Sequence, residues 1–199
     1  FSGTRYLCGD AERLPVADRS VDLLFSSLTL QWCNDLEATF TEFQRVLRPG
    51  GTVLFTTFGP DTLGELRAAW AQVDGHSHVN RFLDMHDVGD AMLRAGLSQP
   101  VMDVDRITVH YDQVRGLMGE LKAIGAHNVT AGRPQGLTGR QRLTTVEKAY
   151  ESLRGERGLP ASYEVVYGHA WAGEVGAASC TTPAAGEATV SLDQLRRNS

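Results

Sequence analysis

Cysteine is scarce in this chain of 199 residues. It has only three, Cys8, Cys33 and Cys180, an odd number at wide spacing. This pattern excludes a disulfide scaffold and lacks the close ligand pairs typical of a metal site, so we expect no metal. The sequence also lacks an apolar run of the ~20 residues that span a bilayer, and no signal peptide opens it. Together these absences favour a reducing, cytoplasmic location.

An excess of positive charge is lacking as well. Lys and Arg number 19 against 24 Asp and Glu, a formal net charge of −5, which disfavours nucleic-acid binding over the whole surface. Residues 133–157 depart from this balance, because their cations outnumber their anions. The cations are Arg133, Arg140, Arg142, Lys148, Arg154 and Arg157, and the anions are Glu147, Glu151 and Glu156. The local excess indicates either a solvated helix face or a docking patch for an acidic partner.

The first third of the chain predicts alternating strands and helices. Hydrophobic residues make up 42% of the whole chain, and its length fits one domain. We predict strands at residues 6–8, 21–26 and 52–57. Between the last two, Asn34 and Glu37 form a capping-box pattern before an apolar stripe, and Pro49-Gly50-Gly51 ends the predicted helix. Strand, helix and strand at this spacing predict a βαβ unit, and therefore a doubly wound, mostly parallel α/β sheet.

Apolar periodicity predicts further elements in the rest of the chain. We predict helices that open at Pro60 and lie at residues 85–95, 114–124 and 143–153. Strands are predicted at residues 163–171 and 101–111, the latter bent near Asp105-Arg106, where its alternation changes phase. A Gly-rich loop spans residues 132–139. Residues 173–188 have too little apolar area to order themselves, which predicts a domain over 1–172 and a flexible tail over 173–199.

Polar turns follow the first two predicted strands. They are Gly9-Asp10-Ala11 and Ser26-Ser27-Leu28. In open parallel sheets, ligands bind outside the carboxyl ends of the strands. The Asp10 carboxylate can accept a hydrogen bond from an exocyclic amine, and the next backbone N–H can donate to a ring nitrogen, which suits adenine. Alternatively, Asp10 caps a loop, as Asp after Gly commonly does.

Several of these segments resemble a known family. Gly9-Asp10-Ala11-Glu12, the apolar strand at residues 21–26 and Leu47-Arg48-Pro49-Gly50-Gly51 are similar to class I S-adenosylmethionine-dependent methyltransferases. Later motifs are more selective and resemble the biotin-pathway malonyl-[acyl-carrier protein] O-methyltransferases, the BioC family. These motifs are Leu30-Gln31-Trp32-Cys33, Asn80-Arg81-Phe82-Leu83, Leu121-Lys122-Ala123-Ile124-Gly125-Ala126 and the strand at residues 163–171.

The resemblance implies roles for particular residues. Asp10 and Ala11 would hold the adenine of S-adenosylmethionine, and Ser26, Ser27 and Leu28 would line its methionine end. Gln31 and Trp32 would lie near the transferred methyl group, although Trp32 is equally typical of a core aromatic. Residues 112–157 would form a helical substrate lobe within the domain. The family's glycine-rich loop and ribose-binding acidic residue would lie before Phe1, so we expect the chain to be part of a longer product that binds the cofactor poorly on its own.

The implied reaction, methyl transfer to the carboxylate of a malonyl-acyl carrier protein for biotin synthesis, needs little acid–base chemistry. A carboxylate with a pKa of about 4 is already ionised at neutral pH. The enzyme must align the reacting atoms, exclude water and select the carboxylate with a cation. We therefore expect the histidines, including His76, His78 and His86, to be loop or helix-edge residues. The candidate cations for the carboxylate or the acidic carrier are Arg81, Lys122, Arg133, Arg140, Arg142 and Lys148.

Other interpretations stay open on the sequence alone. A small-molecule methyltransferase would need no basic segment. A methyltransferase-like assembly factor of respiratory complex I shares the implied fold and hydroxylates arginine. A truncated chain without activity would show no saturable binding of S-adenosylhomocysteine.

Overall fold

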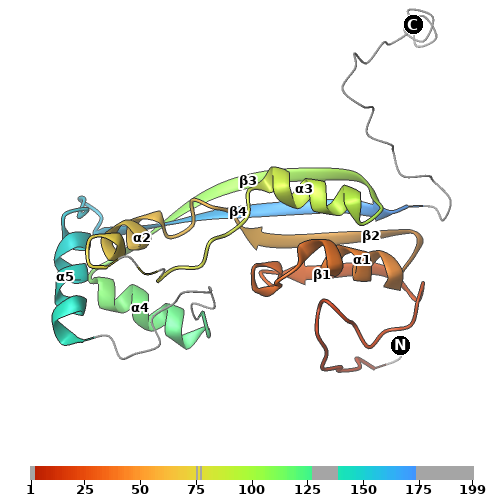
Figure 1. Cartoon of the computed structure of the whole chain (residues 1–199), viewed down its shortest axis with the longest axis horizontal. Coiled ribbons are helices and arrows are strands. Elements are labelled where there is room, and N and C mark those ends of the chain that lie inside the picture. The colour runs from red at the N-terminus through yellow and green to blue at the C-terminus, as the bar shows by residue number, and fades with distance from the viewer. Residues whose placement is uncertain (1–2, 75, 77, 127–138, 174–199) are drawn as a thin grey trace, which may run out of the picture.

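A computed structural model describes residues 3–74, 76, 78–126 and 139–173. Its centre is a four-stranded mixed sheet in the order β1-β2-β4-β3 (Figure 1). The strands are β1 (Val21–Ser27), β2 (Leu47–Phe58), β3 (Leu97–Tyr111) and β4 (Leu159–Ala172). β1 and β2 are parallel, as the βαβ prediction requires, whereas β4 is antiparallel to both β2 and β3. The predicted Gly-rich loop at 132–138 and tail at 174–199 lie outside the described residues.

The first predicted strand does not form. Residues 3–9 adopt no strand, and Tyr6 is 91% exposed. In the described part of the chain β1 pairs with β2 alone, so residues 6–8 have no neighbouring strand to complete their hydrogen bonds. The prediction of a strand at this position is therefore wrong for this structure, and the segment from residue 3 to residue 20 instead runs as a loop beside β1.

Helix α1 (Leu36–Val46) connects the parallel pair. Its cap is Asp35, whose side chain accepts a hydrogen bond from the backbone N–H of Ala38 at 2.9 Å, so the prediction of Asn34 was one residue early. Asn34 instead donates its backbone N–H to Glu12 Oε1 at 2.6 Å. The helix passes directly into β2 at Leu47, so the Pro-Gly-Gly turn lies within the strand rather than ending the helix.

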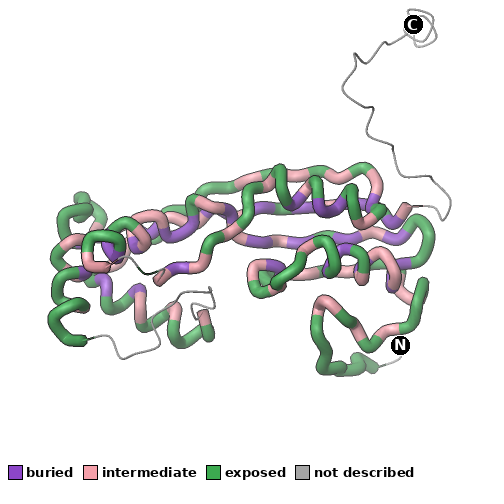
Figure 2. The backbone as a smooth tube through the Cα atoms, in the orientation of Figure 1, coloured by how far each residue is buried: buried purple, intermediate pink, exposed green. Residues whose placement is uncertain are grey.

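One face of the sheet is covered by α1 and α3 (Met85–Arg94). Figure 2 shows burial concentrated on the middle strands and on the sides of these helices that face them. We call this core cluster one, built mainly from Phe40, Phe43, Val53, Phe55, Val88 and Met92. The opposite face is open within the described structure, because alternate residues there remain exposed: Leu23, Phe25, Leu54, Tyr167 and Trp171.

The far ends of β3 and β4 carry three more helices, α2 (Gly64–Ala71), α4 (Val114–Ala123) and α5 (Arg140–Glu151). Their core, cluster two, includes Leu66, Trp70, Leu117, Val146, Tyr150 and Leu159. Two predicted details are wrong here. The helix expected at Pro60 begins at Gly64, and Ile124 is exposed at the end of α4 rather than on its buried stripe.

The bend predicted near Asp105-Arg106 is also misplaced. The register of β3 against β4 is continuous from Val101 to Tyr111 and shifts between Ser98 and Val101. Pro100 lies in this irregular stretch, where a residue without a backbone N–H can be accommodated, and Gln99 has a φ of 52°. None of the helices in the described residues is both long and apolar enough to cross a bilayer.

Candidate functional site

A cavity lies at the carboxyl ends of β1 and β2. We call it the strand-end pocket. It has a volume of about 290 Å³ and is lined by Gln31 and Trp32 of the 3-10 helix η1 (Leu30–Trp32), Phe58 of β2, the loop leading to α2, residues 78–80, Phe82, Leu121 of α4 and Tyr163 of β4. Most of its described lining is apolar. It is therefore suited to an extended ligand that is largely shielded from water.

A second cavity runs along β1 and is called the β1 groove. Its volume is about 420 Å³, and its lining includes Ala11, Leu14, Ser26, Ser27 and Thr29. The turn after Gly9 and the serine pair that ends β1 thus face a common space. The two cavities meet along one chain segment, because Ser26, Ser27 and Thr29 line the groove while Leu28, Gln31 and Trp32 line the strand-end pocket.

Hydrogen bonds fix the segment between the two cavities. Leu28 has a φ of 48°, and its N–H donates to the backbone oxygen of Thr56 at 3.0 Å. Gln31 Nε2 donates to the Leu28 carbonyl at 2.6 Å, and Thr57 Oγ1 lies 3.4 Å from Gln31 Oε1. Both polar atoms of the Gln31 side chain are therefore engaged in holding this turn. Trp32 is 39% exposed on the pocket wall, which is not the position of a core aromatic.

Asp10 lies beside the groove in a tight loop. Its Oδ1 accepts a hydrogen bond from the Glu12 N–H at 3.0 Å, and its carbonyl accepts one from the Arg13 N–H at 3.0 Å. This is the loop-capping geometry that the sequence left open. The Asp10 carboxylate can still accept further hydrogen bonds in this geometry. Glu12, to which the sequence assigned no role, links this loop to the start of α1, because its Oε1 accepts hydrogen bonds from the backbone N–H groups of Asn34 and Asp35. These residues are too far apart in the sequence for a local pattern to reveal the contact.

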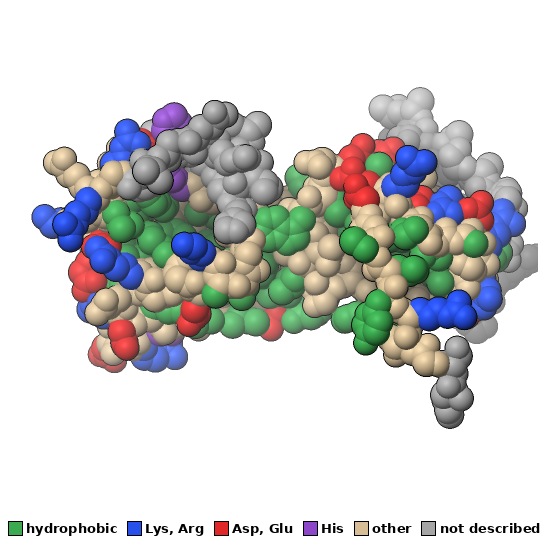
Figure 3. All heavy atoms as spheres, turned by 90° about the horizontal axis from the view of Figure 1, so that it is seen from below, with side chains coloured by type: hydrophobic (Ala, Val, Ile, Leu, Met, Phe, Trp, Pro, Cys, Tyr) green, Lys and Arg blue, Asp and Glu red, His purple; other side chains and the backbone are tan. Residues whose placement is uncertain are grey.

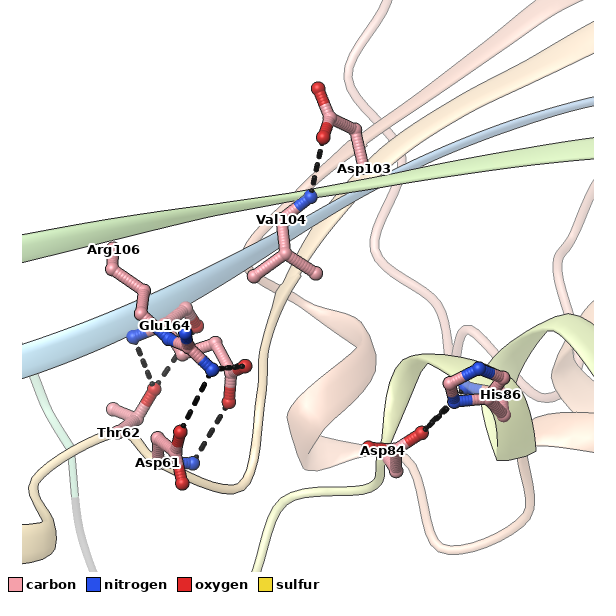
Figure 4. A network of polar contacts seen from close by, with 8 residues as sticks. All are labelled: Asp61, Thr62, Asp84, His86, Asp103, Val104, Arg106 and Glu164. Atoms are coloured by element: carbon pink, nitrogen blue, oxygen red, sulfur yellow. Dashed lines mark hydrogen bonds and ion pairs between the residues drawn. The ribbon is translucent and has the colours of Figure 1, made fainter.

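The loop between β2 and α2 is held by a polar network around Glu164, drawn in Figure 4. Glu164 Oε2 accepts a hydrogen bond from the Asp61 N–H at 2.9 Å, and its backbone exchanges two hydrogen bonds with the Thr62 hydroxyl. Arg106 lies 3.2 Å from Asp61 and 3.5 Å from Glu164. Because Thr62 and Leu63 line the strand-end pocket, this network fixes one of its walls. Helix α2 begins late because Leu63 has a φ of 55°, in the left-handed region, and donates its N–H to the Ser162 carbonyl of β4 at 2.7 Å.

The predicted cations do not converge on the pocket. Arg81 lines a small neighbouring cavity that shares Gln31, Phe58 and Phe82 with it, and Lys122 is exposed on α4, outside the described lining. Arg140 and Lys148 are exposed on α5, and Arg133 lies outside the described residues. Arg142 Nη1 instead lies 3.6 Å from Asp74 Oδ2, behind the pocket wall.

Several of the charged side chains in residues 139–157 form ion pairs. Glu147 pairs with Arg115 and Glu151 with Arg154, so these anions are matched. Within the part of the chain that the structure describes, Arg140, Lys148 and Arg157 form no ion pair. Lys and Arg side chains gather around the end of the molecule formed by α4 and α5 in Figure 3. Ion pairing therefore takes up as many cations as anions in residues 139–157, and their excess of positive charge remains at the surface.

The pocket also contains a residue that sequence reasoning set aside. His78 lies in a loop, as predicted, but this loop forms part of the pocket wall, and the ring stacks on Trp70 with ring centroids 3.7 Å apart. Its Nε2 lies 2.8 Å from Asp74 Oδ1. Burial acts to raise the pKa of the Asp74 carboxyl, but the hydrogen bonds from His78 and the His76 N–H outweigh it and leave this pKa below its ordinary value. Asp74 is therefore an anion at neutral pH.

Comparisons with solved structures bear on the fold. A candidate methyltransferase from Bacillus halodurans C-125 superposes with a TM-score of 0.55 at 14% identity, covering 84% of this chain and 77% of that one. The YcgJ protein from Bacillus subtilis gives a TM-score of 0.53 at 18% identity, covering 84% and 70%. At such low identity these likenesses concern the fold alone, and they confirm the predicted Rossmann-like α/β class.

Comparisons of sequence bear on the family. Residues 2–55 match the family described as a methyltransferase domain. A malonyl-[acyl-carrier protein] O-methyltransferase of Laribacter hongkongensis is 58% identical over 83% of this chain, which spans 56% of that relative. One from Gallionella capsiferriformans is 55% identical over 86% of the chain, which spans 60% of it. The chain thus covers less than two thirds of the length of these two relatives. Malonyl-[acyl-carrier protein] O-methyltransferase 1 of Coxiella burnetii is 45% identical, over 99% of this chain and 69% of its own length. The resemblance seen in the sequence motifs is therefore confirmed, and the chain belongs to the malonyl-[acyl-carrier protein] O-methyltransferase family.

Proposed function

We propose that this protein takes part in transferring a methyl group from S-adenosylmethionine to the free carboxylate of a malonyl-acyl carrier protein, a step of biotin synthesis. The observation that carries the proposal is the meeting of two cavities at the segment from Ser26 to Trp32. A methyl transferase must bring a donor and an acceptor to one point from two sides. A single hydrogen-bonded segment that lines both cavities provides such a point.

The β1 groove has a donor set that fits the cofactor. Ala11, Ser26 and Ser27 line it, and the Asp10 carboxylate beside it retains acceptor capacity for the amine of adenine. When bound, S-adenosylmethionine supplies a methyl group on a positively charged sulfur. We assign Asp10 and Ala11 to the adenine and Ser26, Ser27 and Leu28 to the methionine end.

The strand-end pocket is assigned to the acceptor. Gln31 is locked by the Leu28 carbonyl and Thr57, so it holds the turn at the boundary between donor and acceptor. Trp32 and Phe58 on the wall exclude water from the reacting atoms, which strengthens electrostatic contacts there. No side chain has to remove a proton, because the acceptor carboxylate is already ionised at neutral pH, with a pKa of about 4. The chain's contribution is thus alignment and desolvation.

The lobe of α4 and α5 is proposed to receive the acidic carrier protein. Arg140 and Lys148 are exposed on α5 and form no ion pair among the described residues. Leu121 of α4 lines the strand-end pocket, so a carrier bound at this lobe would deliver its thioester close to the cavity. Complementary charge of this kind chiefly raises the association rate and depends on salt.

The proposal is tested by incubating the protein expressed from its full reading frame with S-adenosylmethionine and malonyl-acyl carrier protein and following the carrier by mass spectrometry. We expect a methyl ester on the malonyl group and no product with acetyl-acyl carrier protein, which has no free carboxylate. Titration with S-adenosylhomocysteine tests the groove separately. Asp10→Asn keeps the Oδ1 that binds Glu12 but removes the charge, and should weaken this binding by about tenfold or more. Asp22→Asn, whose carboxylate pairs with Arg48 on the surface, is the matched control. Saturable binding without methyl ester would reject the malonyl acceptor but keep the cofactor site.

A further inference from the structure

His78 is the centre of a buried side-chain cluster on the wall of the strand-end pocket. Its ring lies parallel to that of Trp70, with 11° between the planes, and its side chain is only 10% exposed. Asp74, which is 11% exposed, bonds to Nε2 at 2.8 Å and also accepts the His76 N–H at 3.0 Å. The imidazole is thus held on one face and at one nitrogen, which fixes the direction of the other.

The charge of Asp74 determines how the imidazole can be used. An ionised carboxylate only accepts hydrogen bonds, so the proton between the two groups lies on Nε2 of His78. Nδ1 is then the ring nitrogen left to bind a ligand, and His78 lines the pocket. On its other side, Asp74 Oδ2 lies 3.6 Å from Arg142 Nη1. The Arg142–Asp74 pair is thus neutral as a whole, and a charged imidazole beside it leaves the cluster with one net positive charge, which an anionic ligand can neutralise.

The pocket offers few other groups to an anionic ligand. Among the described lining residues, His78 is the one side chain that can carry a positive charge. Gln31 Nε2 already donates to Leu28, which leaves it one further N–H, and the Thr62 hydroxyl is committed to the backbone of Glu164. A carboxylate moved into an apolar cavity without a partner costs several kcal/mol or more, so binding requires a cation or strong donors.

We propose that His78 binds the free carboxylate of the methyl acceptor through Nδ1, with Asp74, itself paired with Arg142, as the residue that positions its ring. This inference rests on the proposed function, because it assigns the carboxylate contact within the same pocket. Arg142, Asp74, His78 and the acceptor then form a series of alternating charges. One carboxylate oxygen bonds to His78, and the other attacks the methyl carbon: the new O–CH₃ bond forms, the S–CH₃ bond breaks, and its electron pair stays on the sulfur as a neutral thioether. The ester product has lost the charge that His78 recognises, which favours its release.

The test compares acceptors and variants by binding alone, with no methyl donor present. Malonyl-acyl carrier protein and acetyl-acyl carrier protein are titrated against the whole chain, and the variants are His78→Phe and His78→Gln. Phe keeps the stack on Trp70 but has no donor, whereas Gln keeps a donor without a charge. We expect His78→Phe to weaken malonyl-carrier binding by tenfold or more and His78→Gln by less, with acetyl-carrier binding unchanged in both. His76→Gln, a change at an exposed neighbour, is the control.

Steady-state kinetics add a readout that a purely structural role would not give. The KM for the malonyl carrier should rise in His78→Phe while kcat stays within a few-fold, and the indole resonances in ¹⁵N spectra should report an intact fold. If His78→Phe weakens the binding of malonyl and acetyl carriers equally, the ring only supports the pocket wall. If malonyl-carrier binding is unchanged, the carboxylate is bound elsewhere. Either result overturns the inference. Because binding is measured without the donor, a failure of methyl transfer with a retained malonyl preference would reject the proposed function and leave the role of His78 standing.

Discussion

The two hydrophobic clusters are built in different ways. Cluster one packs α1 and α3 against one face of the sheet, and the other face remains exposed within the described structure, including Phe25 at 68%. Cluster two is enclosed by three helices and the far ends of β3 and β4. Cluster one depends on a sheet with an open face, whereas cluster two is surrounded by its own helices. The strand-end pocket borders cluster two, of which Leu63, Leu66 and Val79 line it.

The largest expected effect is on cluster one. The buried Phe40 ring lies 6.0 Å from Phe43 and 5.4 Å from Phe55, measured between ring centroids. Phe40→Ala should therefore lower the free energy of unfolding by about 3–5 kcal/mol, from lost burial and a cavity that the rigid sheet cannot fill. Urea unfolding followed by circular dichroism measures it. Thr41→Ala, at an exposed position on the same helix, is the control and should change stability by no more than about 0.5 kcal/mol.

The same variant sharpens the comparison between the clusters. If cluster two is held by its own helices, the ¹⁵N indole resonance of Trp70 should keep its native position at urea concentrations where cluster one has begun to unfold. A simultaneous loss of both signals would show that the two clusters unfold as one cooperative unit, in contradiction to the distinction drawn here.

A smaller effect is expected in cluster two. The hydroxyl of the buried Tyr150 donates to the Pro160 carbonyl at 2.7 Å. Burial raises the pKa of Tyr150, with contributions from the charges of Glu65 and Tyr163, so the hydroxyl stays a donor through the neutral range. Tyr150→Phe leaves a carbonyl without this partner and should cost about 1–2 kcal/mol. Thermal unfolding measures the loss, and Tyr111→Phe, which removes a more exposed hydrogen bond to Glu120, should cost less.

The elements that the sequence predicted well are those that carry their own pattern. The apolar run at residues 52–57 and the stripe of α3 lie where periodicity predicts, because burial on one side imposes that spacing. The terminal strand at residues 6–8 failed, since a strand needs a partner that its own residues do not encode. The bend of β3 was misplaced because the change of phase read from side chains does not locate the backbone irregularity at Gln99.

The candidate site was predicted only in part, because some of its contacts join residues that lie far apart in the sequence. The turns at Ala11 and Ser26 do face one groove, as their positions after successive strands suggested. The Glu164–Asp61 contact joins residues 103 positions apart, and no local pattern announces it. His78 lies in a loop, as predicted, but its contact with the pocket was not foreseen. Nothing in the polar stretch around it indicates that the fold places Trp70 against its ring.

The smallest expected effect concerns the loop that borders the β1 groove, which is held to α1 by charge rather than by apolar packing. Glu42 accepts hydrogen bonds from Arg45 and from the Leu14 N–H, the latter at 2.6 Å, and Arg45 also pairs with Asp18. The hydrogen bond from Arg45, aided by the one from Leu14, outweighs burial and lowers the pKa of Glu42. A lowered pKa in the folded state means that this contribution is complete above the ordinary carboxyl pKa and is lost as the pH falls through the folded value.

Glu42→Gln should therefore lower the free energy of unfolding by about 1 kcal/mol or less at pH 7, because the pair is partly exposed. The difference from the unchanged protein should shrink as the pH falls below about 4.3, the ordinary pKa of a glutamate. Urea unfolding at a series of pH values measures it. A difference that stays constant down to the lowest pH at which the protein is folded would mean that the Glu42 side chain acts through its shape and neutral hydrogen bonds. The loop beside the β1 groove would then be held without charge, as the two apolar clusters are.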